Sequence, residues 1–437
     1  MTGNPLMLCA DLAAQARPGE WVEVFARRTR SARTSVTRLH RDSTVSDQLA
    51  DGWLVGIRSV LGDDHGLACT NLLEPASLAA SLASARGIRQ LAPRPWSREL
   101  TQAAGSVPWP GEEPPESAPE AGLAALRGLA QEALQAQEVP SPVVVTAGST
   151  HRTVLRCDSA GGRAAYTQSE AQLHVRSASP GLDAGQEARI RPHPAQLPVP
   201  EVAAGYRRCL RNLSGAPTAV PALDWLALSP LVVARILGRL SRGLVRQPGV
   251  AAELEPGRRL GSRAVTLIDD GRPDGGPAGS PFDDEGTARR RNVLLREGAV
   301  ETLLGSREAG PTTGNASWAG WDSNVTVATT NCFLAPTCEE TAVGALSRPG
   351  TGFIAEEVRG FRSGIDLTSS RIEFELGGAI VRDGEQLGSG RVPVSSRPDQ
   401  FLTTFLQVLP GTEFYRITGL YGGSWCVIDG SRARNDR

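Results

Sequence analysis

Two hydrophobic periodicities alternate along this chain of 437 residues. In its first part, β-branched and aromatic residues alternate with polar ones, as in half-buried strands, which predicts strands over 21–26, 35–39, 52–60 and 66–70. Apolar residues spaced three and four apart then predict a helix that starts near Pro75 and runs through Leu78, Leu82 and Ile88. This order indicates an antiparallel sheet with helical cover.

A break in the pattern separates these elements from a second set. The segment from Pro108 to Pro119 is rich in proline and glutamate, sustains neither periodicity, and predicts an exposed linker. Beyond it we expect an amphipathic helix over 121–137, strands over 143–145, 151–157, 162–168 and 170–178, and a closing helix over 200–213. The residues from Asp158 to Gly162 predict a hairpin turn between two of these strands.

The last part of the chain begins near Pro221 with one clear helix, from Ser229 or Pro230 to Leu244. Many short β-patterned segments punctuated by glycine follow, which is typical of a curved sheet or a barrel-like domain. The sequence therefore predicts an α+β fold, with N-terminal antiparallel sheet and helix layers followed by a larger β-rich C-terminal domain. We expect an N-terminal domain (1–107), a linker (108–120), a middle domain (121–220) and a C-terminal domain (221–437).

Composition narrows the classes of function. The net charge of −1 creates no overall basic field, so nucleic acid is not an expected partner. The chain contains no lysine, which excludes a lysine Schiff base and a lysine-containing phosphate loop. Seven cysteines without a Cys-x-x-Cys pair argue against a disulfide framework and indicate the cytoplasm. We find no signal-peptide pattern and no run of about 18 apolar residues, so we expect no membrane association.

One region of the C-terminal half carries a family resemblance. It reads as a strand (264–268), an acidic loop containing Ser-Pro-Phe-Asp-Asp-Glu-Gly (280–286), a strand (292–295), a turn at Glu297-Gly298, a second strand, and Thr-Gly-Asn (313–315). This order resembles the TldD/PmbA family, and specifically its TldE (PmbA) branch. The resemblance extends from the Asn-Leu-Leu-Glu-Pro at 71–75 to the Gly-Gly-Ser at 422–424.

The acidic loop and the triplet supply the candidate binding residues. Three adjacent carboxylates would repel one another if buried together, so at least some must face water, a cation or backbone donors. Taken alone, such a run is usually a solvated turn, and this interpretation has priority over a metal site. The triplet offers polar groups, although ordinary turn and strand chemistry also accounts for them. The residues we expect to bind a peptide or a partner are Asp283, Asp284, Glu285, Thr313, Gly314 and Asn315.

The resemblance implies a heterodimeric metallopeptidase whose TldD-type subunit carries a zinc-binding His-Glu-x-x-x-His helix. A hydrolytic zinc site needs about three protein ligands and one open position. In this chain the corresponding helix, 229–241, contains no His, Glu or Asp, and cysteines such as Cys332, Cys338 and Cys426 are expected to be buried hydrophobic side chains. No Glu follows any of the five histidines, which are His40, His65, His151, His174 and His193. We therefore expect no catalytic residue, cofactor or metal ligand here, and zinc in the partner.

Function follows from the resemblance. It implies a non-catalytic TldE-like subunit that pairs with a TldD-like metallopeptidase and helps to hold unfolded peptides or precursors of peptide natural products. Open strand edges could accept such a peptide by main-chain pairing. Two alternatives stay open. One is a self-sufficient hydrolase with an unrecognised site, for instance the acidic run with a cation, and the other is a regulatory or interaction protein without a peptidase role.

Overall fold

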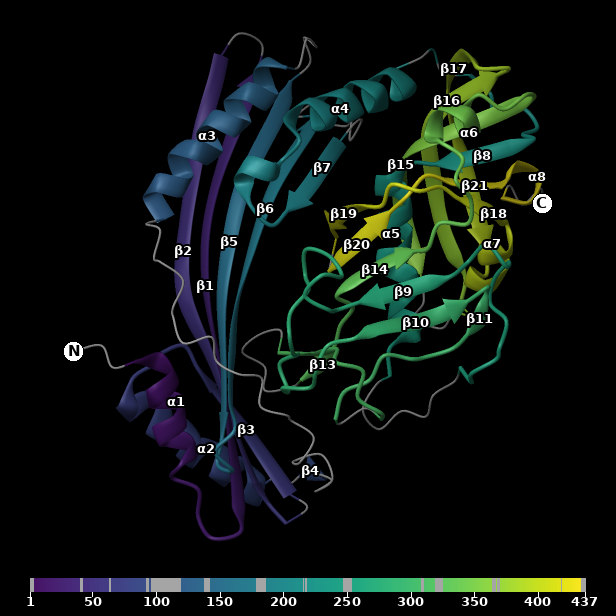
Figure 1. Ribbon diagram of the computed structural model, residues 1–437. Coiled ribbons are helices and arrows are strands. Elements are labelled where there is room, and N and C mark those ends of the chain that lie inside the picture. The colour runs from purple at the N-terminus through teal and green to yellow at the C-terminus, as the bar shows by residue number, and fades with distance from the viewer. Residues whose placement is uncertain are drawn as a thin grey trace.

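The structure is a computed structural model. It describes residues 4–39, 42–62, 64–91, 94–95, 119–136, 142–177, 186–214, 216, 218–246, 254–307, 310–318, 325–363, 367, 370–417 and 419–433. Figure 1 shows a long twisted sheet that carries helices, next to a compact β-rich part. The expected linker at 108–120 lies outside the described residues, apart from 119–120 at the start of a helix.

A seven-stranded antiparallel sheet forms the first part, in the order β4-β3-β2-β1-β5-β6-β7. Its strands are β1 (Glu20–Leu39), β2 (Asp42–Leu61), β3 (Asp64–Thr70), β4 (Arg94–Pro95), β5 (Val143–Asp158), β6 (Arg163–Ser177) and β7 (Gln186–Arg191). Several segments expected as separate strands are halves of one long strand, because main-chain pairing continues where the side-chain alternation weakens. The predicted hairpin turn between β5 and β6 is confirmed, since the Asp158 N–H donates to the Gly162 carbonyl at 3.0 Å.

The sheet does not stop at the boundary expected between the first two domains. Strand β1 pairs with β5 from Glu23 opposite Asp158 to Arg38 opposite Val143. Residues from both 1–107 and 121–220 therefore contribute to one continuous sheet, and hydrogen bonds along a full strand hold the two segments together.

Helices cover one face of this sheet. They are α1 (Pro5–Ala13), α2 (Pro75–Leu91), α3 (Pro119–Gln135) and α4 (Val199–Leu213), with a short 3₁₀ turn at Pro194–Gln196. On β1, Val22 and Val24 pack against α1 and α2, while Ala32 and Val36 pack against α3 and α4. Because side chains alternate along a strand, odd-numbered β1 residues such as Phe25 belong to the other, helix-free face. That face is turned toward the C-terminal part (Figure 1).

The C-terminal part contains two six-stranded sheets. The first, in the order β11-β10-β9-β14-β20-β19, is made of β9 (Leu267–Asp270), β10 (Arg291–Arg296), β11 (Ala299–Val300), β14 (Asn331–Leu334), β19 (Glu413–Arg416) and β20 (Leu420–Gly423). The second, in the order β17-β16-β15-β8-β21-β18, is made of β8 (Trp225–Leu228), β15 (Thr351–Ser363), β16 (Ile372–Arg382), β17 (Glu385–Ser396), β18 (Phe405–Val408) and β21 (Cys426–Asp429). A separate two-stranded ribbon is formed by β12 (Ala316–Ser317) and β13 (Thr326–Val327), which pair with each other.

Helix α5 (Pro230–Leu240) packs into the core between these sheets, contributing Val232 and Ile236 among others, and continues as a 3₁₀ turn at Ser241–Leu244. The short helices α6 (Ala342–Leu346), α7 (Pro398–Thr403) and α8 (Gly430–Ala433) complete the part. The predicted α+β class is confirmed, although within the described residues neither six-stranded sheet closes into a barrel. No helix in the described part of the chain is both long and apolar enough to span a membrane.

Candidate functional site

The acidic run 283–285 is buried where the C-terminal part docks on the helix-free face of the seven-stranded sheet. Its side chains are between 1% and 7% exposed, so the interpretation as a solvated turn is wrong. Asp284 accepts a hydrogen bond from the Trp318 N–H at 2.7 Å and lies 3.6 Å from the Arg27 guanidinium of β1. The Trp318 ring stacks on Phe25, with ring centroids 5.6 Å apart. The run therefore joins the two parts of the protein.

Backbone donors surround the first carboxylate of the run. Asp283 accepts hydrogen bonds from the N–H groups of Glu285, Thr287 and Ala316 at 3.0, 2.9 and 2.9 Å. Burial and the neighbouring Glu285 charge nevertheless raise the pKa of Asp283 to about 7. The expectation that some of these carboxylates meet backbone donors is confirmed.

Arginines surround the last carboxylate. Glu285 lies 3.4 Å from Arg58 and accepts the Arg307 N–H at 2.9 Å. Arg58 also pairs with Glu23 at 2.9 Å, and Arg156 reaches the same Glu23 at 2.7 Å. Burial alone would raise the pKa of Glu23, but the three guanidinium groups of Arg156, Arg307 and Arg58 bring it below its ordinary value. This buried network uses the lone pairs that a cation would need.

The triplet Thr313, Gly314 and Asn315 is also buried and bonded internally. The Thr313 hydroxyl accepts the Gly305 N–H at 2.9 Å, and the Asn315 amide donates to the Asp269 carboxylate of β9 at 2.6 Å. Gly314 has a φ of +77°, and a Cβ there would lie 2.6 Å from a backbone carbonyl oxygen. These side chains hold the loop against β9, so their role in binding a peptide or partner stays a prediction.

One cavity between the two parts lies between the helix-free sheet face and α5. It has a volume of about 450 Å³. Helix α5 contributes Leu231 and Arg235, which lie four residues apart and so face the same side. The sheet contributes Arg33, Ser35, Thr37, Val144, Thr146, Gln172, Leu173, His174, Arg176, Gln186, Ala188 and Ile190. The end of β19 contributes Tyr415 and Arg416, and Ile417 follows directly after that strand.

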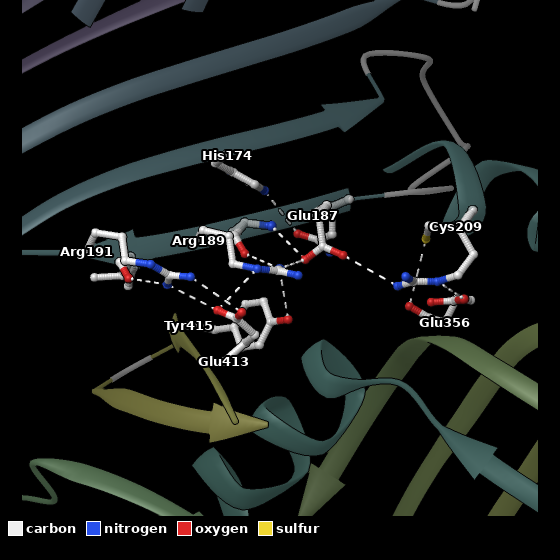
Figure 2. Close-up of polar contacts among 12 residues, drawn as sticks. His174, Glu187, Arg189, Arg191, Cys209, Glu356, Glu413 and Tyr415 are labelled. Atoms are coloured by element: carbon white, nitrogen blue, oxygen red, sulfur yellow. Dashed lines mark hydrogen bonds and ion pairs between the residues drawn. The ribbon is translucent and has the colours of Figure 1, made fainter. Parts of the chain in front are cut away.

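Ion pairs join β7 and β19 beside this cavity, and Figure 2 shows the side chains that form them. Glu413 of β19 lies 3.2 Å from Arg189 and 3.1 Å from Arg191 of β7. Arg189 also donates to the Tyr415 hydroxyl at 3.1 Å, and Tyr415 is itself a lining residue. These contacts fix β19 of the C-terminal part against β7, the last strand of the seven-stranded sheet.

One histidine lies in the wall of the cavity. The ring of His174 on β6 is hydrogen-bonded to the side chain of Gln186, with His174 Nε2 3.3 Å from Gln186 Oε1 (Figure 2). Burial first, and then the nearby Arg176, Arg235 and Arg33, lower the pKa of His174 to about 4. The imidazole is therefore neutral near pH 7, and its Nε2 carries the proton that is donated to Gln186.

The α5 residues that line the cavity do not fit the zinc that the resemblance implies for a catalytic subunit. Arg235 and Leu231 are not zinc ligands. Cys426 is buried, and its thiol donates to the Ser424 carbonyl oxygen at 3.5 Å. Among the described residues, no group of three or more His, Cys, Asp or Glu side chains is placed to hold a metal ion.

The arginines of the cavity are not predicted by any sequence pattern. Arg33, Arg176 and Arg235 come from β1, β6 and α5, and no motif connects them. With 46 basic residues that are all arginine, composition did not single any of them out. The available signal was Arg235, an isolated charge within the apolar run of 231–237.

Comparison with known proteins gives a consistent picture. Residues 227–415 match the family model of the PmbA/TldA metallopeptidase C-terminal domain. A metalloprotease of Methanocaldococcus jannaschii is 34% identical over 85 residues, which span 18% of this chain and only 19% of that relative.

Solved structures resemble the chain over nearly its whole length. TldE from Thermococcus kodakarensis superposes with a TM-score of 0.71 at 15% identity, covering 94% of this chain and 95% of that one. A candidate modulator of a DNA gyrase from Thermotoga maritima superposes with a TM-score of 0.76 at 16% identity, covering 97% and 98%. At these identities the likeness shows the shared fold.

Proposed function

We propose that this chain is the non-catalytic, TldE-like subunit of a pair with a TldD-like zinc metallopeptidase, because residues 227–415 match the family model of the PmbA/TldA metallopeptidase C-terminal domain. The proposed substrates are unfolded peptides or precursors of peptide natural products, processed in the cytoplasm. This chain would hold the substrate, and the partner would supply the zinc and the water-activating carboxylate.

The observation that carries this proposal is the composition of α5 where it faces the cavity. A helix that bound catalytic zinc would present nitrogen, sulfur or carboxylate ligands there. Here Leu231 and Arg235 occupy the cavity side. This arrangement supports a cavity that contacts a substrate without activating water.

The helix-free sheet face supports the substrate class. Short polar side chains such as Ser35, Thr37 and Thr146 line it. Such a surface suits an extended main chain, which needs hydrogen-bond partners more than shaped pockets.

The self-sufficient hydrolase finds no comparable support. The acidic run 283–285 is buried, and backbone N–H groups and arginines already occupy its carboxylates. A cation would have to displace these partners, and each buried donor left unpaired costs about 1–3 kcal/mol.

The test is to measure zinc content and hydrolysis of an unfolded polypeptide for this chain alone, for a candidate TldD-like partner alone, and for the two co-expressed. A partner whose metal-motif glutamate is changed to glutamine serves as the matched control. We expect zinc and activity in the pair, and loss of activity in the control. Zinc and activity in this chain alone would overturn the proposal, as would a partner equally active without it.

A further inference from the structure

We propose that the cavity beside α5 binds the carboxylate side chains of an acidic, extended peptide segment. The inference rests on the proposed function, because it specifies the substrate class of the same cavity. The binding groups are Arg33, Arg176 and Arg235, which we call the arginine cleft.

Positive charge dominates the space around the cleft. A second cavity, of about 470 Å³, adjoins the first and shares Arg176, Gln186 and Arg235 with it. The described residues that line the two cavities include one carboxylate, Glu357, and five arginines, which are Arg33, Arg176, Arg235, Arg359 and Arg416.

Two of these arginines form ion pairs with carboxylates, and the charge of a third, Arg235, favours the ionised form of Glu357. Arg359 lies 2.7 Å from Glu357, and Arg416 pairs with Glu170. Arg33 and Arg176 are exposed and, within the part of the chain that the structure describes, have no ion-pair partner. A ligand carboxylate can therefore meet them without displacing a described carboxylate.

The lowered pKa of His174 agrees with the positive charge of the arginine cleft. Its imidazole is neutral near pH 7 and lies close enough to the three arginines for their charges to lower its pKa further. Bound carboxylates would offset those charges and raise the pKa of His174.

The register of the sheet favours several carboxylates over a single small anion. Arg33 lies opposite Gly148 of β5, which lies opposite Gln172 of β6, and Arg176 is four residues further along β6. With strands about 4.8 Å apart and a rise of about 3.3 Å per residue, the Cα atoms of Arg33 and Arg176 are roughly 16 Å apart. One carboxylate cannot pair closely with both without drawing the two side chains together. An extended peptide places carboxylates on one side at intervals of about 7 Å and can serve both.

Side chains between the arginines suit a peptide main chain. Thr146 and Gln172 line the same face between Arg33 and Arg176, and each offers both donor and acceptor groups. Arg235 lies across the cavity on α5 and supplies a third guanidinium from the opposite wall.

The test is direct binding to this chain alone, measured by fluorescence anisotropy with a labelled, C-terminally amidated Glu-rich peptide. Three comparison ligands are used. Two are peptides in which Gln replaces every Glu, one of them amidated and the other with a free C-terminal carboxylate, and the third is a single-stranded DNA oligonucleotide. We expect the Glu-rich peptide to bind most tightly, and its affinity to fall as salt is raised. Equal binding of either Gln peptide, or tighter binding of the DNA, would overturn the proposal.

Variants locate the binding. The double variant R33Q/R176Q should weaken binding of the Glu-rich peptide roughly tenfold, whereas R33K/R176K should retain part of it. The matched control is R296Q, which removes an arginine that is 59% exposed and pairs with Glu301 on the β10–β11 hairpin. Equal weakening by the control, or none by R33Q/R176Q, would refute the assignment.

Failure of this inference and failure of the proposed function are distinguishable. A co-expressed pair that hydrolyses peptides without any preference for acidic segments would refute the arginine cleft and leave the subunit role intact. Binding of the Glu-rich peptide that depends on Arg33 and Arg176, in a chain that never supports a partner's activity, would do the reverse.

Discussion

Asp283 offers the sharpest test of how the acidic run works. Replacing it with alanine removes both carboxylate oxygens and leaves the N–H groups of Glu285, Thr287 and Ala316 without their acceptor. Replacing it with asparagine keeps one oxygen. If that oxygen serves Glu285 and Thr287, as Oδ1 does now, the Ala316 N–H faces an amide group instead of an acceptor.

The magnitude follows from counting donors. An unsatisfied buried N–H costs about 1–3 kcal/mol, so D283N should lower the free energy of unfolding by about that amount. D283A leaves three donors, one of them only partly buried, and should cost about 3–6 kcal/mol. Since domains are typically stable by about 5–15 kcal/mol, D283A should approach the limit of folding.

The assay is urea unfolding near neutral pH, followed by tryptophan fluorescence and far-ultraviolet circular dichroism. The matched control is D274A, which removes an aspartate that is 79% exposed and lies 3.9 Å from Arg272. It should change the unfolding midpoint little. If D283A unfolds at the same urea concentration as D274A, the carboxylate does not hold this junction and the reasoning is refuted.

Two further predictions concern the triplet and the cavity. G314A should destabilise the protein more than G257A. Both glycines have positive φ (+77° and +88°), but only a Cβ at Gly314 meets a backbone oxygen, at 2.6 Å. Equal thermal midpoints of the two variants would contradict this prediction. The folded pKa of His174, about 4, lies below the ordinary 6.5, so its contribution to stability is present above about pH 6.5 and is lost as the pH falls toward 4. Wild type should therefore lose up to about 2 kcal/mol more than H174Q between pH 7 and pH 5 in urea titrations, and parallel losses would show that His174 titrates normally.

The periodic elements could be predicted because local pattern specifies them. The helix expected from Pro75 is α2, and the apolar run after Ser229 is α5. Strand lengths were underestimated, since β1 continues through the polar stretch around Arg30 by pairing with β2 and β5 on both sides. The strand expected over 264–268 begins only at Leu267, because the Val265 N–H closes a turn onto the Ser262 carbonyl at 3.1 Å.

The acidic run shows where local reasoning stops. A run of three carboxylates is usually solvated. Burial removes its water, and donors from distant segments must offset that cost. Arg27 and Arg58 come from β1 and β2, more than two hundred residues away in sequence from Glu285. No pattern of neighbouring residues predicts such partners.

Neighbouring residues are enough to predict the alternation of strands and helices, the order of motifs that resembles TldE, and the lack of zinc ligands on the helix at 229–241. The burial of the acidic run at the junction, and the placement of Arg33, Arg176 and Arg235 around one cavity, depend on how distant segments pack. Burial and the local electrostatic field are set by the surfaces that meet when the sheet and the C-terminal part pack together, and no stretch of neighbouring residues specifies those surfaces.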